Sequence, residues 1–216
     1  MTIEEIREKI LTDADYVQSQ IDLLASYFQL KHTIRWAHKR IHEDETESVA
    51  EHIFGLHILI DYFFPLVDDY VLDLNKIRHL ATWHDMAEAF VGDMTTRAKT
   101  QEHKDKEKEA EQKIIESAPQ HLQDILKAVY NEFDARITPE SKFVKALDRI
   151  EPFFYLYFLS KKTKDYTTYF DLGWTAEEYR SHRHPFVSEF GVIKRFDDIL
   201  YENLKVTNFH PKKLPI

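Results

Sequence analysis

The stretch that decides the fold runs from Val49 to Asp93. It opens with VAEH and closes with HDMAEAFVGD, and its polar residues of interest are His52, His84, Asp85, Glu88 and Asp93. Side chains of these types can hold one divalent metal ion and leave carboxylates over to handle a water molecule. A later fragment, FVKALDRI, adds Asp148 as a candidate for the last ligand.

The HisAsp pair at positions 84 and 85 carries no weight by itself. The chain has 12 histidines in 216 residues, and with its aspartates chance predicts about one HisAsp pair. The pair gains meaning only from its place on the predicted helices.

Length and composition favour a single helical domain. The chain is 43% apolar, which suffices for a sizeable core in one compact domain. It has only 4 glycines and 7 prolines and is rich in helix-forming residues, so we predict an all-α protein. It has no cysteine, which excludes disulfides, cysteine-ligated zinc and thiol nucleophiles.

Charge and hydropathy limit the partners. A net charge of −9 argues against binding of nucleic-acid polymers, whose phosphates attract basic surfaces. A small anionic substrate is still compatible with local arginines and lysines. The first residues lack the apolar segment of a signal peptide, and no run of 18 apolar residues occurs. We therefore expect a cytoplasmic protein without a membrane partner.

The order of helices follows from periodicity and capping signals. Residues 3 to 30 form one long or broken amphipathic segment, expected to pack as a cover. Ser48 and Glu51 fit a capping box that opens a helix from Val49 to about residue 64. Asp73 is the candidate N-cap of a helix from residue 74 to about 90, which Gly92 would stop.

Further helices complete the chain. Residues 102 to 116 form a charged, solvated helix, and Pro119 begins another. Thr138 and Pro139 open the helix that carries Asp148 and continues through the aromatic run at 153–158.

Polar residues stand in this pattern where apolar ones are expected. Ile77, Ala81, His84 and Glu88 follow at intervals of 4, 3 and 4, so one stripe starts apolar and ends polar. Burial of Asp85 and Asp148 as bare carboxylates would be costly, and a shared divalent cation would offset that cost. Mn, Fe, Co, Ni or Zn suits such ligands, and Mg is a further candidate. The alternative is that the histidines are hydrogen-bonded core residues and that the aspartates pair with Arg35, Arg78 or Arg149.

A family resemblance rests on these residues. The order His, HisAsp and a distant Asp on successive helices resembles the HD-domain metal-dependent phosphohydrolase superfamily. RW at 35–36, TESVAEH at 46–52, HDMAEAFVGD at 84–93 and LD at 147–148 are similar to the HD-domain 5′-deoxynucleotidase family. The resemblance covers roughly residues 30 to 160. After GlyAsp the family commonly has LeuPro, whereas this chain has MTTRAK, and its C-terminal third does not align.

The resemblance implies roles for eight residues. It makes His52, His84, Asp85 and Asp148 the ligands of one divalent metal ion. It makes Glu88 and Asp93 the carboxylates that act on the attacking water and the leaving group. It assigns Arg35 to the substrate phosphate and Trp36 to the space near C2′ of the sugar, where crowding favours deoxyribose.

The leading hypothesis is an HD-domain helical bundle, a single domain over residues 1–216 with a catalytic core at about 30–160 and a helical extension at about 165–216. It would remove the 5′-phosphate from nucleoside monophosphates, with deoxyribonucleotides preferred. The alternatives are an HD-fold phosphodiesterase, a triphosphate hydrolase or a di-iron oxygenase using His57 and His79, and a non-enzymatic nucleotide-binding module. An apparent surplus of aromatic residues predicts a homodimer; these are Tyr155, Tyr157, Phe158, Phe186 and Phe190.

Overall fold

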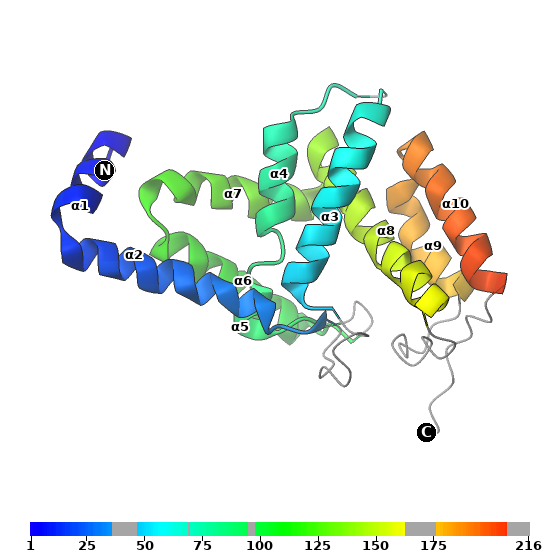
Figure 1. The fold of residues 1–216 in the computed structure, drawn as a ribbon, viewed down its shortest axis with the longest axis horizontal. Helices are drawn as coiled ribbons and strands as arrows, with labels where there is room; N and C mark the ends of the chain where they lie inside the picture. The colour runs from blue at the N-terminus through cyan, green and yellow to red at the C-terminus, as the bar shows by residue number, and fades with distance from the viewer. Residues whose placement is uncertain (36–46, 69, 95–97, 163–175, 207–216) are drawn as a thin grey trace, which may run out of the picture.

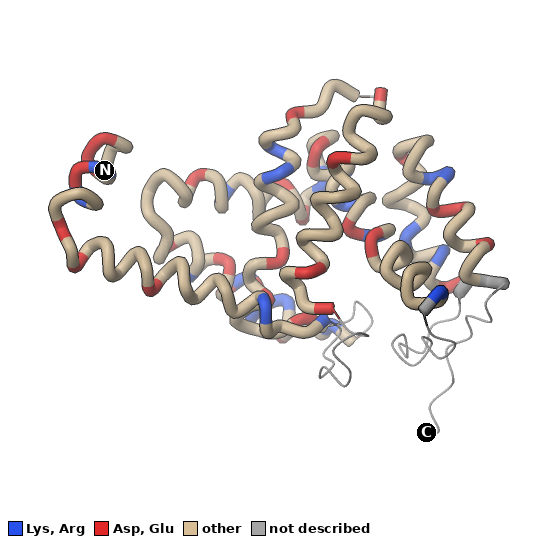
Figure 2. The backbone as a smooth tube through the Cα atoms, in the orientation of Figure 1, with Lys and Arg blue, Asp and Glu red and all other residues tan. Residues whose placement is uncertain are grey.

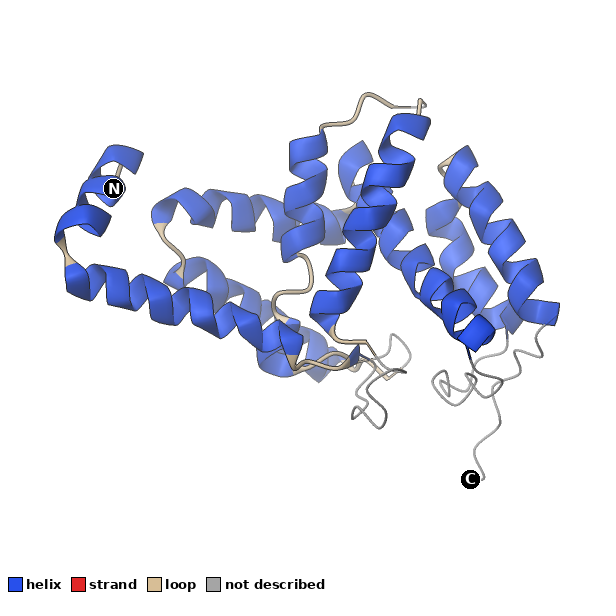
Figure 3. Ribbon diagram, in the orientation of Figure 1, coloured by secondary structure: helices blue, strands red, loops and turns tan. Residues whose placement is uncertain are grey.

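The fold is all-α, as predicted. The computed structural model describes residues 1–35, 47–68, 70–94, 98–162 and 176–206. Its helices are α1 (Ile3–Thr12), α2 (Ala14–Tyr27), η1 (Phe28–Lys31), α3 (Val49–Phe63), η3 (Phe64–Leu66), α4 (Leu74–Trp83), α5 (Glu88–Val91), α6 (Gln101–Ser117), α7 (Gln120–Ala135), α8 (Pro139–Lys162), α9 (Ala176–Val187) and α10 (Gly191–Val206). Within these ranges there is no strand (Figure 3), and only an isolated bridge joins Ile34 to Ser48.

Two predicted helix starts are confirmed in atomic detail. The Ser48 hydroxyl accepts a hydrogen bond from the backbone N–H of Glu51, and the Glu51 carboxylate accepts one from the N–H of Ser48. Asp73 caps α4 by accepting from the N–H groups of Asn75 and Lys76. These caps satisfy amides that have no partner inside the helix, so they fix where α3 and α4 begin.

The helix expected from residue 74 to about 90 is not continuous. It ends at Trp83, residues 84–87 form turns, and α5 begins at Glu88. Backbone bonds in this segment close over three residues, as in the N–H of Glu88 to the carbonyl of Asp85. Periodicity could not reveal the break, because the buried face continues through it. Gly92 does end α5, and its positive φ of 79° is a conformation that glycine adopts without strain.

The N-terminal segment covers less than expected. It breaks at Asp13, which ends α1 and caps α2. Figure 1 shows α1 and the start of α2 at one end of the molecule, while the end of α2 lies beside α6 and reaches the core with Tyr27. Leu11, Ile21 and Leu24 are exposed by 81%, 52% and 52%, so much of this apolar face has no cover in the monomer.

Helix α8 is the central element of the core. It packs against α3, α4 and α7 on one side and against α9 and α10 on the other (Figure 1). Its fully buried residues include Phe143, Leu147 and Leu156. A helix contacted from several directions holds its polar side chains in fixed positions, and α8 carries Asp148.

The C-terminal helices continue this core. Phe190 is fully buried and packs edge-on against Phe143 of α8. The idea that Phe190 is surplus to the core is therefore wrong, because α9 and α10 add core volume that the sequence did not reveal. Phe158 is 48% exposed, while Tyr155 and Tyr157 are partly buried.

Residues Val49–Leu66 form the one described segment that is long and apolar enough to cross a membrane by length and composition. The mean hydropathy of this segment is 1.3, and 28% of it is buried. It packs on α4 and α8 and carries the buried His52. A core helix of a folded domain passes the same test.

Candidate metal centre

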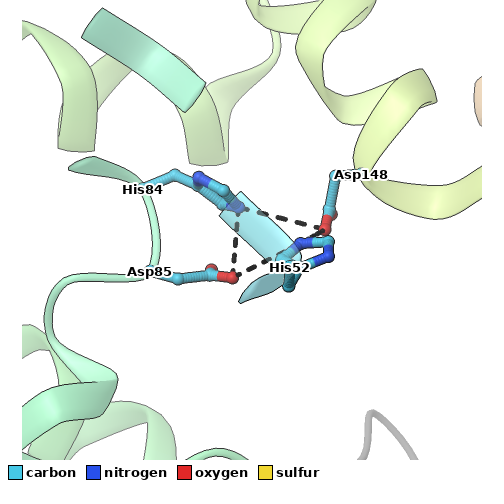
Figure 4. A group of neighbouring side chains, drawn as sticks. All are labelled: His52, His84, Asp85 and Asp148. Carbon is cyan, nitrogen blue, oxygen red and sulfur yellow. Dashed lines mark ion pairs between the residues drawn. The ribbon is translucent and has the colours of Figure 1, made fainter. Parts of the chain in front are cut away.

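Four predicted ligands converge at one point. His52 comes from α3, His84 and Asp85 from the turn after α4, and Asp148 from α8. Figure 4 shows their polar atoms directed toward one another. One ligand atom from each residue can be chosen so that all lie within 4.8 Å of one another. Two ligands on opposite sides of a metal ion lie about 4.2 Å apart, so small adjustments suffice to hold one ion.

The distances fit a shared cation. The Nε2 atom of His84 lies 3.1 Å from Asp85 Oδ2 and 3.9 Å from Asp148 Oδ1. The Nε2 atom of His52 lies 3.3 Å from Asp148 Oδ1 and 3.9 Å from Asp85 Oδ2. Both Nε2 atoms are buried without a hydrogen bond of good geometry in the described part of the chain. Orphaned ring nitrogens beside two carboxylates are the arrangement that a divalent metal satisfies.

The outer nitrogens of both histidines are fixed. His84 places Nδ1 3.0 Å from the carbonyl oxygen of Ala81, which can only accept a hydrogen bond. Nδ1 of His84 is therefore the donor of this hydrogen bond, and Nε2 is the nitrogen that faces the site. The Nδ1 atom of His52 lies 2.5 Å from Glu151 Oε2. Such outer partners orient a metal-binding imidazole and increase its basicity.

The break after α4 explains how consecutive residues serve one site. In a regular α-helix neighbouring side chains diverge by about 100°. His84 keeps helical backbone angles of φ −58° and ψ −37°, and the tighter turn that follows it carries Asp85. The turn at residues 84–87 brings both side chains to the site, while α4 still anchors the turn through the bond from His84 N–H to the Leu80 carbonyl.

The pKa values reflect a crowded, buried site. Burial opposes ionisation of Asp148, but Lys145, His52 and Arg149 outweigh it and hold its pKa well below the usual range. Burial and the Arg35 charge oppose protonation of His52, yet Glu151 and Asp148 raise its pKa to about 10. Without a cation the carboxylates thus draw a proton onto His52, and a metal ion would compete for that position.

Glu88 and Asp93 also lie at the centre. Both are buried, each with an exposed fraction of 9%. Burial, together with the charges of Asp85 and Asp93, raises the pKa of Glu88 well above its ordinary value. Gly92 turns the chain after α5 and so brings Asp93 back toward the charge of Arg35.

Arg35 is held beside the site by a backbone bridge. Its N–H donates to the carbonyl of Glu47, next to the start of α3. Its guanidinium lies 3.5 Å from the carboxylate of Glu47 and 3.8 Å from that of Glu151. Burial would lower the Arg35 pKa, but Glu47, Asp93 and Glu151 raise it. Trp36 lies outside the described residues.

The arginine pairings of the alternative interpretation are only partly present. Arg149 lies 3.9 Å from Asp148, whereas Arg78 pairs with the exposed Asp61, away from the site. The histidines suggested for a second iron lie elsewhere: His57 is within 3.2 Å of the Thr82 hydroxyl, and His79 is exposed. Neither belongs to the metal-capable groups found among the described residues.

Three contributors escaped prediction from the sequence. Glu151 orients His52, Glu47 holds Arg35, and Lys145 places its Nζ 2.9 Å from Asp148 Oδ2. Glu151 and Lys145 stand three residues after and before Asp148 on α8, a spacing that places side chains on one helix face. The spacing of three residues around Asp148 is the sequence feature from which Lys145 and Glu151 could be predicted to lie near it.

A cavity of ≈580 Å³ opens beside the metal centre. His84, Asp85 and Glu88 line one part of it, and Phe133 and Phe186 contribute apolar surface. Arg35 does not line it. Cavities of 300–1,000 Å³ hold small organic ligands, so the site offers a metal centre and a ligand space in contact.

Comparison with known proteins gives the chain its relatives. The HD-domain family profile matches residues 28–184. The chain is 32% identical over 128 residues to the 5′-deoxynucleotidase HDDC2 of Xenopus laevis, which covers 57% of this chain and 60% of that protein. It is 30% identical to the human protein of that name, over 62% and 65% of the two chains. It is 32% identical to the 5′-deoxynucleotidase hdd1 of Schizosaccharomyces pombe, over 62% and 68%. The matches to the two HDDC2 proteins thus span less than two thirds of those relatives.

The fold has a counterpart among solved structures. The crystal structure of a "predicted metal-dependent phosphohydrolase" from Magnetospirillum magnetotacticum superposes with a TM-score of 0.70, covering 89% of this chain and 94% of that one. The two sequences are 17% identical, so this likeness concerns the fold alone.

Proposed function

Because the chain belongs to the HD-domain family, we propose that it is a metal-dependent phosphohydrolase that releases the 5′-phosphate of nucleoside monophosphates, with deoxyribonucleotides preferred. The observation that carries the proposal is the convergence of His52, His84, Asp85 and Asp148 beside a ligand-sized cavity. The relatives named 5′-deoxynucleotidase support the nucleotide as substrate.

The residues present fit one divalent cation held by these four side chains. Such an ion lowers the pKa of bound water toward neutrality and stabilises charge on a phosphoryl group. Glu88 lines the cavity beside Asp85, within reach of a bound substrate, and Asp93 lies buried near it. We assign this pair to the proton transfers of hydrolysis, one to the attacking water and one to the leaving oxygen.

Arg35 is the proposed phosphate ligand: it does not line the cavity, but it adjoins the metal centre through Glu151, which also contacts His52. A guanidinium can meet two phosphate oxygens at once, which orients the group for attack. In the described structure its charge is shared with Glu47 and Glu151. Before substrate binds, these carboxylates hold Arg35 in place. We expect the substrate phosphate to compete with them for the guanidinium.

The test is phosphate release from a panel of ribo- and deoxyribonucleoside monophosphates with Mn²⁺ or Co²⁺. We expect activity that a chelator removes and that Asp85→Ala, Glu88→Gln and Asp93→Asn each lower by at least about 100-fold. Asp61→Ala, in an exposed ion pair on α3, is the control and should retain activity. Release that persists at full rate in Asp85→Ala would exclude this site.

We further propose that the protein is a cytoplasmic homodimer. The exposed residues Phe54, Ile58 and Tyr62 form a stripe on α3 with exposed fractions of 69%, 56% and 53%. Apolar residues repeated at this spacing on a helix surface suit a protein interface. Light scattering should give twice the mass of 25.8 kDa, and Ile58→Glu should give a monomer. A wild-type monomer at all concentrations would contradict the dimer.

A further inference from the structure

The cavity beside the metal centre is rich in basic residues. Six of the 29 lysines and arginines of this acidic chain line it: Lys99, Lys104, Lys108, Arg136, Lys145 and Arg149. Apart from Asp85 and Glu88, its acidic lining is Glu107, Glu111 and Asp134. Elsewhere aspartates and glutamates are spread over α1 and α2 as well as over the other helices (Figure 2). The basic residues are thus concentrated where a ligand would lie.

Several of these cations already have carboxylate partners. Lys99 lies 2.6 Å from Glu107, and Lys108 lies 2.8 Å from Glu111. Lys145 is bound to Asp148. In the described ranges no ion pair connects Arg136 to a carboxylate, so its charge is available to a ligand.

Arg136 lies at the rim of the cavity, where α7 ends in the left-handed backbone conformation. It ends α7 with φ 50° and ψ 41°, and it is the only residue other than glycine with positive φ among those described. A side chain in this region costs about 1 kcal/mol or more relative to glycine. The left-handed residue ends α7, as it does many helices, and its N–H donates to the carbonyl of Glu132.

Arg136 and a second arginine meet on one aromatic ring. The guanidinium carbon of Arg136 lies 4.9 Å from the centre of the Phe186 ring, and that of Arg149 lies 5.3 Å from it. Phe186 belongs to α9, Arg149 to α8 and Arg136 to the end of α7. Arg149 also lies 3.9 Å from Asp148, while Arg136 has no ion pair in the described ranges, so an anion bound beside the ring would be attracted by both guanidinium groups and would balance the charge of Arg136.

We propose that Arg136 and Arg149, supported by Phe186, bind a second phosphate group of the substrate. The preferred substrates would then be nucleotides with two phosphate groups, one hydrolysed at the metal centre and one held by the arginines. This rests on the proposed hydrolase function: nucleoside monophosphates remain substrates, and nucleotides with a second phosphate are added as the preferred ones. In the reaction water oxygen bonds to phosphorus, the bond from phosphorus to the leaving oxygen breaks, and a proton passes to that oxygen.

The second phosphate could stand on the 3′-hydroxyl or follow the first in a 5′-diphosphate. The experiment compares kcat/KM for a deoxynucleoside 5′-monophosphate, its 3′,5′-bisphosphate and its 5′-diphosphate at fixed Mn²⁺. We expect one of the doubly phosphorylated compounds to exceed the monophosphate by about tenfold or more, since bonds to charged groups contribute that much. The better of the two identifies the position of the second phosphate.

Arg136→Gln should reduce that ratio toward one, because the neutral side chain keeps the length but loses the charge. Arg78→Gln, which removes an arginine from an exposed pair with Asp61, should leave the ratio unchanged. A wild-type ratio near one, or a ratio that Arg136→Gln does not alter, overturns the inference while the monophosphate activity stands.

Calorimetry separates this inference from the proposed function. Binding of the same three compounds to the Mn²⁺-loaded protein reports the second phosphate even if none is hydrolysed. Tighter binding of a doubly phosphorylated compound, weakened in Arg136→Gln, supports the arginine site. Equal affinity for all three compounds excludes it.

Discussion

At the scale of single residues, the candidate metal centre depends on groups outside its four proposed ligands. Glu151 lies against Nδ1 of His52, and the Ala81 carbonyl accepts from Nδ1 of His84. In both histidines the other ring nitrogen, Nε2, is then directed at the two aspartates. The roles of the ligands therefore depend on hydrogen bonds outside the ligand set.

Glu151→Gln tests this dependence. The amide keeps the size of the side chain but loses the charge that stabilises His52, so we expect metal affinity and activity to fall by about 10–100-fold. The metal affinity is measured by titrating the protein with metal ion in a calorimeter, and the activity by phosphate release.

Glu140→Gln is the matched control for Glu151→Gln. Glu140 is buried on the same helix, where it lies 3.4 Å from Lys76, remote from the ligands. It should leave metal affinity unchanged. Equal losses of metal affinity in both variants would show that the substitutions act through folding. Unchanged metal affinity in Glu151→Gln would show that Glu151 does not support His52 as a ligand.

At the scale of elements, the site forms where α3 crosses α8. Gly55 stands three residues after His52, so it lies on the same face of α3. A Cβ at this position would come within 2.5 Å of the Glu151 carboxylate oxygen. The glycine lets α8 bring Glu151 close enough to reach His52. Pro152 follows Glu151 and has no backbone N–H. The carbonyl of Asp148, one turn earlier, therefore does not receive the helical hydrogen bond from that position.

Gly55→Ala should therefore displace the Glu151 carboxylate. We expect destabilisation of about 1–3 kcal/mol, typical of overpacking, together with weaker metal binding. Denaturant unfolding of the metal-free protein measures the first and metal titration the second.

Gly191→Ala provides the comparison, because an added Cβ there meets nothing within 4 Å. It should change neither quantity appreciably. A Gly55→Ala protein with wild-type metal affinity would show that Glu151 can move without consequence for His52.

At the scale of the whole molecule, a buried ion pair joins the two C-terminal helices to each other. Arg183 of α9 and Asp197 of α10 are exposed by 1% and 0%, and the guanidinium donates to the carboxylate. The same guanidinium lies 3.7 Å from the centre of the Phe153 ring on α8. These contacts join α9 and α10 to the helix that carries Asp148.

Asp197→Ala should leave Arg183 charged and unpaired in the interior. Loss of one partner of a buried pair costs about 3–5 kcal/mol, which denaturant unfolding followed by helical circular dichroism will measure. Asp198→Ala on the same helix, in a more exposed pair with Arg180, should cost about 1 kcal/mol or less.

The double variant Arg183→Met with Asp197→Leu should recover most of the stability, because it removes both charges together. If Asp197→Ala costs no more than Asp198→Ala, the buried pair does not hold α9 and α10 together.

The sequence by itself determined the helical class, the starts of α3 and α4 and, through the family resemblance of its motifs, the identity of the four side chains that converge. Capping and periodicity depend on hydrogen bonds and contacts within a few residues, so they can be recognised along the chain. The tertiary structure decided the turn at residues 84–87, the arginine pair on Phe186 and the link from His52 to Glu151. His52 and Glu151 are 99 residues apart, and their contact arises only because α3 and α8 pack together. Contacts between distant segments depend on how whole helices pack, which local patterns do not specify.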